Sequence, residues 1–156
     1  AEHRRLAGLD PRSLNPFHLL YADATSAHLT WSDGATLHQR TLEPGLHIVS
    51  ERSPADGTDT PRAARIRARW AALAAGGAPH ALELGMLLAE HDADHPFDAV
   101  CVHADALGYG TRSSAVVRLA ASGLAESELW WAEGKPCVTE LVDRRDLLRN
   151  LAGAAG

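Results

Sequence analysis

The segment 108–114 (Gly-Tyr-Gly-Thr-Arg-Ser-Ser) places three hydroxyl side chains and a guanidinium between two apolar runs. Its two glycines permit tight backbone geometry, and every side chain from Thr111 to Ser114 can form hydrogen bonds. Polar groups clustered between apolar strands need partners, which can be one another, water or a ligand. The segment therefore predicts either a ligand-binding turn or a polar turn whose hydroxyls satisfy their own backbone.

Arg112 is the residue of this segment best suited to catalysis, because its guanidinium is a fixed cation. Such a cation at a sheet edge can hold a substrate carboxylate or a developing oxyanion, with Thr111, Ser113 and Ser114 orienting it or the substrate. The alternative is an ion pair between Arg112 and an acid such as Asp105 that joins two strands. Neither serine is expected to act as a nucleophile, because no Gly-x-Ser-x-Gly elbow surrounds it.

Cysteine and histidine residues could supply a second kind of chemistry. Cys101 and His103 share one face of a predicted strand, so the two side chains can form a pair. A metal site would need two further ligands, and a catalytic pair would need a nearby base. We therefore predict that Cys101 and His103 only pack against each other. Cys101 and Cys137 are expected to be buried free thiols, although a disulfide remains open if their strands are neighbours.

The segment His91–Pro96 contains histidine and aspartate, which are ligand types for metal ions. Its spacing does not match the twelve-residue calcium loop, because the Gly and the distal Glu of that loop are absent. A solvated loop is the simpler interpretation. The chain also lacks a Cys-x-x-Cys-His motif for haem attachment. The sequence therefore predicts no metal site and no cofactor.

The composition is that of an ordinary globular protein of 156 residues, 46% hydrophobic and 22% charged, with a net charge of −5. This length suits a single domain, which we place at residues 1–151, followed by a loose tail at 152–156. Nucleic acid is not an expected partner, because its binding requires a basic excess. No apolar run reaches the roughly 20 residues of a membrane span, and no signal-peptide pattern is present. The predicted compartment is cytoplasmic.

The first half of the chain predicts strands followed by helices. Alternating apolar residues predict strands near 17–21, 28–31, 35–42 and 46–50, with Ser32-Asp33-Gly34 as a hairpin turn. Thr60 and Pro61 begin a helix with an apolar stripe on one face, and a second helix is expected at 80–90. The arginines on the other, solvated face of the first helix are Arg62, Arg65 and Arg69.

The second half predicts strands near 100–103, 114–119, 126–132 and 137–142, and a terminal helix at 144–151. Strand runs separated by a pair of helices predict an α+β fold with antiparallel sheets and two central helices. At the other end, residues 1–9 resemble the end of a helix with no capping residue before it. This opening predicts that further sequence lies upstream.

Three blocks of the sequence, in order, are Asn15–Leu20, Pro44–Ser50, and Cys101–His103 running into Tyr109–Ser114. Together they resemble the NRDE family, also called the transport and Golgi organisation protein 2 family. The Tyr-Gly-Thr-Arg-Ser-Ser block is the most specific of the three. The resemblance spans roughly residues 6–148 and corresponds to the family's C-terminal portion. The Asn-Arg-Asp-Glu motif that names the family does not occur in this chain.

The resemblance implies an αββα sandwich like that of N-terminal-nucleophile hydrolases, of which this chain forms part. Hydrolysis of an amide C–N bond is implied only when the chain is joined to an N-terminal half with the nucleophile, whose α-amine can act as the base. The alternative is a non-enzymatic carrier of an apolar ligand, such as a lipid or haem. The implied partners are therefore a small-molecule or lipid-like ligand and the chain's own N-terminal half.

The candidate catalytic residue is Arg112. The candidate ligand-binding residues are Tyr109, Thr111, Ser113, Ser114 and Asn15. One departure from the family concerns Glu51, which follows Ser50 where the family commonly has Asn. An ionised carboxylate only accepts hydrogen bonds, so Glu51 cannot donate to an oxyanion as that Asn could.

Overall fold

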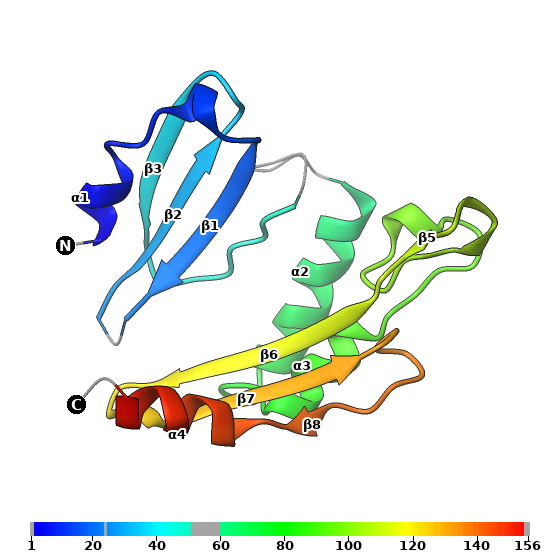
Figure 1. The fold of residues 1–156 in the computed structure, drawn as a ribbon. Helices are drawn as coiled ribbons and strands as arrows, with labels where there is room; N and C mark the ends of the chain where they lie inside the picture. Colours follow the sequence, from blue (N-terminus) through cyan, green and yellow to red (C-terminus); the bar gives the residue numbers. More distant parts are fainter. Residues whose placement is uncertain (1, 24, 51–59, 155–156) are drawn as a thin grey trace. The chain divides into compact units, whose positions relative to one another are not determined.

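The computed structural model describes residues 2–23, 25–50 and 60–154 (Figure 1). They belong to two compact units, residues 1–58 and 59–156, which we treat one at a time. Helices are combined with three small antiparallel sheets of three, two and three strands, so the predicted α+β class is confirmed. Within the described ranges, no helix is both long enough and apolar enough to cross a membrane.

The N-terminal unit is an antiparallel meander with a short helix. Its elements are α1 (Glu2–Leu6), the 3-10 turn η1 (Pro11–Ser13), β1 (Phe17–Ala22), β2 (Ala27–Ser32) and β3 (Leu37–Leu42). The strands pair in the order β1-β2-β3. The predicted hairpin between β2 and β3 is confirmed. In it, the Asp33 carboxylate accepts the N–H groups of Ala35 at 2.8 Å and Thr36 at 2.7 Å, while Gly34 adopts a φ of 91°.

A polar network joins α1 to this sheet. Thr30 is fully buried, and its hydroxyl lies 3.0 Å from the hydroxyl of Tyr21 and accepts a hydrogen bond from Gln39 Nε2 at 3.1 Å. Gln39 Nε2 also donates to the carbonyl of His3 at 2.8 Å, and His3 Nδ1 contacts the Tyr21 hydroxyl. The network satisfies a buried hydroxyl that would otherwise destabilise the sheet.

The strand predicted at 46–50 is wrong, because only Ser50 forms an isolated bridge there. Instead His47 Nε2 bonds back to the carbonyl of Glu43 at 2.7 Å, and the side chains of Leu46 and Val49 are exposed. A segment that turns back on itself in this way gains no ladder of strand hydrogen bonds. The predicted role of Glu51 falls outside the described residues.

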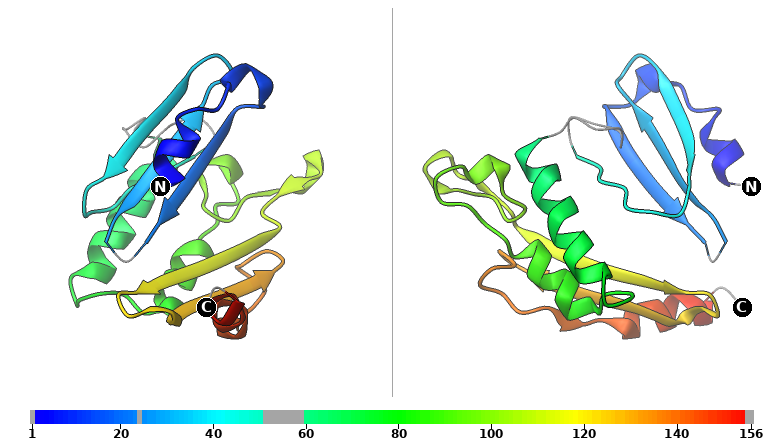
Figure 2. Two further views of the ribbon diagram at one scale, coloured as in Figure 1. Left: turned by 60° about the vertical axis from the view of Figure 1, so that its left-hand side comes forward. Right: turned by 180° about the vertical axis from the view of Figure 1, so that it is seen from behind.

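The C-terminal unit contains two helices, a long hairpin and a terminal helix (Figures 1 and 2). Its larger elements are α2 (Pro61–Ala74), α3 (Ala81–Leu88), β6 (Ser113–Ala120), β7 (Gly123–Glu133), β8 (Val142–Asp143) and α4 (Arg145–Ala154). Between α3 and β6 lie η2 (Pro96–Asp98), β4 (His103–Ala104), η3 (Asp105–Leu107) and β5 (Tyr109–Gly110). α3 packs on β6 and α4 packs along β7. α4 continues past its predicted end at Leu151.

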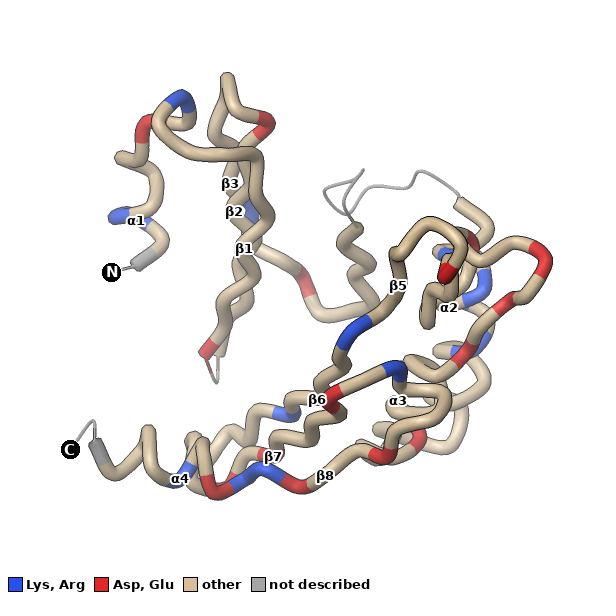
Figure 3. Tube along the Cα trace, turned by 45° about the vertical axis from the view of Figure 1, so that its right-hand side comes forward, with Lys and Arg blue, Asp and Glu red and all other residues tan. Residues whose placement is uncertain are grey.

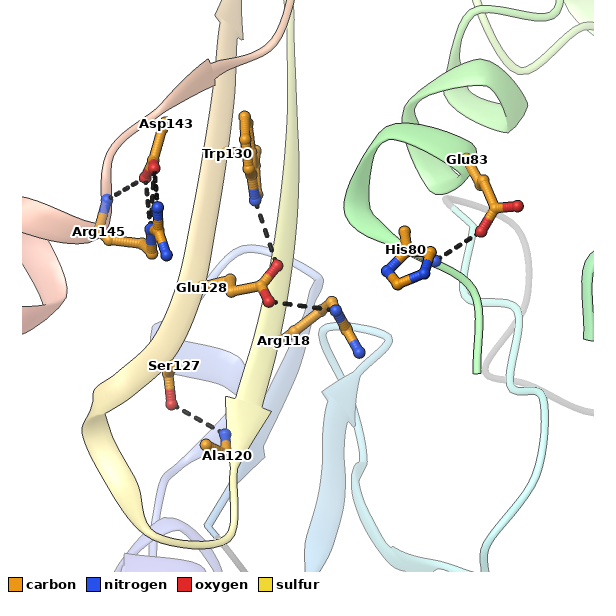
Figure 4. Close-up of polar contacts among 9 residues, drawn as sticks. All are labelled: His80, Glu83, Arg118, Ala120, Ser127, Glu128, Trp130, Asp143 and Arg145. Carbon is orange, nitrogen blue, oxygen red and sulfur yellow. Dashed lines mark hydrogen bonds and ion pairs between the residues drawn. The ribbon is translucent and has the colours of Figure 1, made fainter. Parts of the chain in front are cut away.

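Local side-chain hydrogen bonds begin the helices of this unit where the sequence predicts them. The hydroxyl of Thr60 accepts the N–H of Ala63 at 3.2 Å at the start of α2. At the start of α3, the Glu83 carboxylate accepts the N–H of His80 at 2.7 Å (Figure 4). Both helices are thereby stabilised at their first turns.

The β6–β7 hairpin is stabilised across its strands (Figure 4). Arg118 Nη1 donates across the hairpin to the Glu128 carboxylate at 3.1 Å, and within β7 Trp130 Nε1 donates to the same carboxylate at 3.3 Å. Near the turn the register shifts between Arg118 and Ala120. The buried hydroxyl of Ser127 accepts the N–H of Ala120 at 2.9 Å there, so the irregular backbone keeps its hydrogen bond.

Two other predicted strands are shorter in the structure. In the region of 100–103 only His103 belongs to a strand, because the N–H of Cys101 donates to the carbonyl of Glu90 at 2.8 Å and the N–H of Val102 to a side chain. In the region of 137–142 only Val142 belongs to a strand. There the carbonyl of Lys135 accepts the N–H groups of Val138 and Thr139, both at 3.0 Å, which turns the chain before β8.

The arginine row of α2 pairs with the loop that follows α3. Arg65 forms an ion pair with Asp92, and Arg69 Nε lies 3.7 Å from the Glu90 carboxylate. Figure 3 shows basic positions of α2 beside acidic positions of this loop. The Arg65 guanidinium and the N–H of His95 lower the pKa of Asp92 to about 2. Arg65 and Arg69 therefore anchor the loop, while the Arg69 side chain stays 59% exposed, so the prediction of a solvated face is correct only in part.

Candidate functional site

Two residues of the predicted site segment hold the chain just before β4. The Thr111 hydroxyl accepts the N–H of Val102 at 2.9 Å, and the Thr111 N–H donates to the carbonyl of Val102 at 3.0 Å. A side chain on Gly110 would bring its Cβ to 2.9 Å from the same carbonyl. Gly110 and Thr111 thus form a clamp that fixes the position of Cys101 and His103.

Arg112 is exposed at the junction of β5 and β6. In the part of the chain that the structure describes, it forms no hydrogen bond or ion pair. The alternative prediction, an ion pair between Arg112 and Asp105, is wrong, because the Asp105 carboxylate binds Lys135 Nζ at 2.7 Å instead. The guanidinium of Arg112 is therefore available to an anion, and its removal should cost the fold little.

The remaining predicted ligand-binding residues have varied surroundings. Tyr109 is exposed, and its ring centroid lies 5.9 Å from that of Phe97. Ser113 and Ser114 begin β6, and the Ser114 hydroxyl is buried without a partner among the described atoms. Asn15 is exposed ahead of β1 and belongs to the N-terminal unit. The structure therefore groups residues 109–114 in one stretch of the C-terminal unit and leaves Asn15 outside it.

A thiol–imidazole cluster lies beside the clamp. His103 Nε2 is 3.3 Å from Cys101 Sγ and 3.1 Å from Cys137 Sγ. Both cysteines are free thiols. Cys101 is fully buried, as the sequence predicts, whereas Cys137 is half-buried. The predicted packing pair of Cys101 and His103 thus gains a second sulfur.

The other nitrogen of His103 faces a cation. Lys135 Nζ lies 3.4 Å from His103 Nδ1 while it also donates to Asp105. An ammonium can only donate, so in this arrangement Nδ1 is the acceptor and Nε2 carries the proton. The Nε2–H group then points toward the two sulfurs. Asp105, Lys135, His103 and Cys137 form one continuous chain of polar contacts.

The two thiols differ in their surroundings. Burial raises the pKa of the Cys101 thiol above its ordinary value, while a hydrogen bond from the Cys137 backbone and the charge of Lys135 act in the opposite direction. Cys101 therefore persists as a neutral thiol unless something replaces its proton. Cys137 is the accessible member of the pair, because it also lines the groove described next.

An open groove of about 630 Å³ runs between α3 and the segment 136–141. We call it the α3 groove. Its apolar side chains include Leu82, Met86 and Val138, which are 59%, 68% and 79% exposed. Gly85 lies at its base, where any added Cβ would clash with Leu141 Cδ1. The complete lining is Leu82, Gly85, Met86, Ala89, Pro136, Cys137, Val138, Thr139, Glu140 and Leu141.

Sequence reasoning missed both the third member of the cluster and the groove. The available signals were the Cys-x-His spacing at 101–103 and the Lys-Pro-Cys run at 135–137, which are separated by a complete hairpin. Searches against known protein families, curated proteins and solved structures found no match to this chain. Its chemistry is therefore inferred from the groove, the clamp and the cluster themselves.

Proposed function

We propose that this chain binds an apolar, lipid-like small molecule in the α3 groove. The observation that carries the proposal is the groove's apolar lining. Its volume of about 630 Å³ lies within the range of roughly 300–1,000 Å³ of small-molecule sites. Leu82, Met86 and Val138 expose most of their side chains there, so an apolar occupant would remove much of their surface from water.

The polar groups of the groove indicate what kind of occupant fits. Glu140 supplies a carboxylate on the segment that forms one wall, whereas the hydroxyl of the neighbouring Thr139 lies close to Gly134. A carboxylate repels an anionic headgroup and accepts hydrogen bonds from a neutral or cationic one. The occupant that fits best is a long-chain molecule whose polar end is a hydroxyl or an amine.

The resemblance to the NRDE family gives this binding function a wider setting. The three sequence blocks support a place for the chain in the αββα sandwich of N-terminal-nucleophile hydrolases. Amide hydrolysis on that scaffold requires an N-terminal nucleophile. Arg112 would then act in catalysis only in a protein that also contains that nucleophile, whereas the lining of the α3 groove comes from the C-terminal unit alone.

A titration with a fluorescent long-chain alcohol tests the binding proposal. We expect saturable binding to the purified chain and a loss of at least tenfold in affinity, about 1.4 kcal/mol, in Met86→Glu. The matched control is Leu107→Glu, because Leu107 is 72% exposed and is not part of the groove lining. The control should bind within about twofold of the parent, since the two changes add the same charge to equally accessible positions.

Two results would overturn the proposal. One is the absence of saturable binding, and the other is an equal loss of affinity in both variants, which would indicate a non-specific effect of charge. Haem is examined separately by adding it to the chain and recording the absorbance spectrum. An unshifted Soret band excludes haem as the occupant and leaves the lipid-like molecule to be judged by the titration.

A further inference from the structure

Three side chains with soft or borderline donor atoms meet beside the clamp, and a fourth, His91, lies with its ring centroid 5.2 Å from that of His103. They come from three separate segments: His91 follows α3, Cys101 and His103 lie at β4, and Cys137 lies in the turn after β7. The sulfurs of Cys101 and Cys137 lie 3.3 Å and 3.1 Å from His103 Nε2. One donor atom each from His91, His103 and Cys137 can be chosen so that all lie within 4.8 Å of one another.

The two N···S distances at His103 are close to those between ligands of one tetrahedral Zn²⁺ ion. Zn–N bonds of about 2.0–2.1 Å and Zn–S bonds of about 2.3 Å at a tetrahedral angle place nitrogen and sulfur about 3.5 Å apart. The two N···S distances at His103 differ from that value by only a few tenths of an ångström. His91 is exposed, so its side chain is free to rotate the remaining distance toward the cluster.

We propose that His91, Cys101, His103 and Cys137 form a structural Zn²⁺ site. Two thiolates and two imidazoles are a common complete ligand set for zinc. Binding replaces the two thiol protons, so the site of two thiolates and one Zn²⁺ carries no net charge. Such a site would join the loop after α3 to β4 and to the turn after β7.

The surrounding backbone already holds these segments together. The N–H of Cys101 donates to the carbonyl of Glu90 at 2.8 Å, which brings the residue next to His91 against the first cysteine. The clamp of Gly110 and Thr111 fixes Val102 on the other side. Little backbone ordering is then left to oppose metal binding, and this raises the affinity of a site.

Lys135 has to change partner when the metal binds. With Zn²⁺ on Nε2, the proton of His103 moves to Nδ1, which becomes a donor and no longer accepts from the ammonium. Lys135 then keeps Asp105, to which it already donates at 2.7 Å. Zinc binding therefore replaces one weak contact of 3.4 Å and leaves the stronger ion pair intact.

The test uses Zn²⁺ and Co²⁺ alone with the full, untagged chain under reducing conditions. We expect one equivalent of Zn²⁺ per chain, and in the Co²⁺ form we expect visible bands of tetrahedral cobalt and an ultraviolet thiolate-to-cobalt band. Cys137→Ser and His91→Ala should each lower the Zn²⁺ affinity at least tenfold. His95→Ala is the matched control, because His95 is an exposed histidine in the same loop that lies outside the ligand set.

The spectrum of the unaltered chain keeps the proposal testable even if a variant folds poorly. Octahedral cobalt bands without a thiolate band would overturn the proposal, as would binding of less than half an equivalent of Zn²⁺. Equal affinities for His95→Ala and His91→Ala would remove His91 from the site and overturn the four-ligand assignment. The zinc test is read with the metal alone and the groove test with a long-chain alcohol, so failure of the zinc proposal is distinguishable from failure of the groove.

Discussion

The clamp at Thr111 can be tested by replacing its hydroxyl with a methyl group. Thr111→Val keeps the β-branched shape, so it should open no cavity and keep the strand geometry. It removes the acceptor that lies 2.9 Å from the N–H of Val102. Val102 is only 7% exposed, so water has poor access to the released N–H group.

The expected cost follows from that geometry. A buried donor left without an acceptor costs about 1–3 kcal/mol, and no compensating packing is gained at Val102. For a unit of this size the urea dependence is about 2 kcal/mol per molar. A loss of about 2 kcal/mol would therefore lower the urea midpoint by about 1 M, and the hydrogen-exchange protection of the Val102 amide should fall with it.

The matched control is Thr111→Ser, which retains the hydroxyl and should lose less than half as much stability. Urea unfolding of both variants, followed by the fluorescence of the tryptophans of the C-terminal unit, measures the difference. A value for Thr111→Val within about 0.3 kcal/mol of the parent would refute the clamp. Thr111 would then return to the set of hydroxyls available to a ligand, as the sequence alone allows.

Two further outcomes are expected. Hydrogen bonds from the N–H and hydroxyl of Thr25 and from Ser26 lower the pKa of Asp23 from 3.8 to about 2. Because the pKa of Asp23 is lower in the folded state, its contribution to stability is complete above about pH 4 and is lost as the pH falls through 2. NMR titration of the Asp23 carboxyl carbon measures this pKa, and a midpoint near 3.8 would contradict the prediction. Arg112→Ala should change the free energy of unfolding by less than about 0.5 kcal/mol, measured by thermal and urea denaturation, and a larger loss would reveal a structural partner.

Local sequence signals predict those elements whose structure depends on neighbours along the chain. The Asp33-Gly34 turn and the Thr60-Pro61 helix start are examples, because each is fixed by residues within a few positions. The hydroxyl and carboxylate that cap these elements can be identified in the sequence by type and spacing. Their geometry does not require knowledge of what packs against them.

The wrong strands have a different cause. Alternation of Val100, Cys101 and Val102 is typical of a strand, but the N–H groups of Cys101 and Val102 are taken by the Glu90 carbonyl and the Thr111 hydroxyl. Those partners are nine or more positions away along the chain. A pattern of apolar residues indicates that a segment is buried, but it does not indicate which distant group accepts the hydrogen bonds of that segment.

The predicted site segment and the thiol–imidazole cluster are linked through Val102. Gly110 and Thr111 are conspicuous in the sequence because of their polar neighbours, yet they act on the carbonyl and the N–H of the residue between Cys101 and His103. A substitution at Thr111 should therefore alter the cluster as well as the fold. If the four-ligand site is correct, Thr111→Val will weaken Zn²⁺ binding although Thr111 donates nothing to the metal, whereas Arg112→Ala, one residue further along, will not.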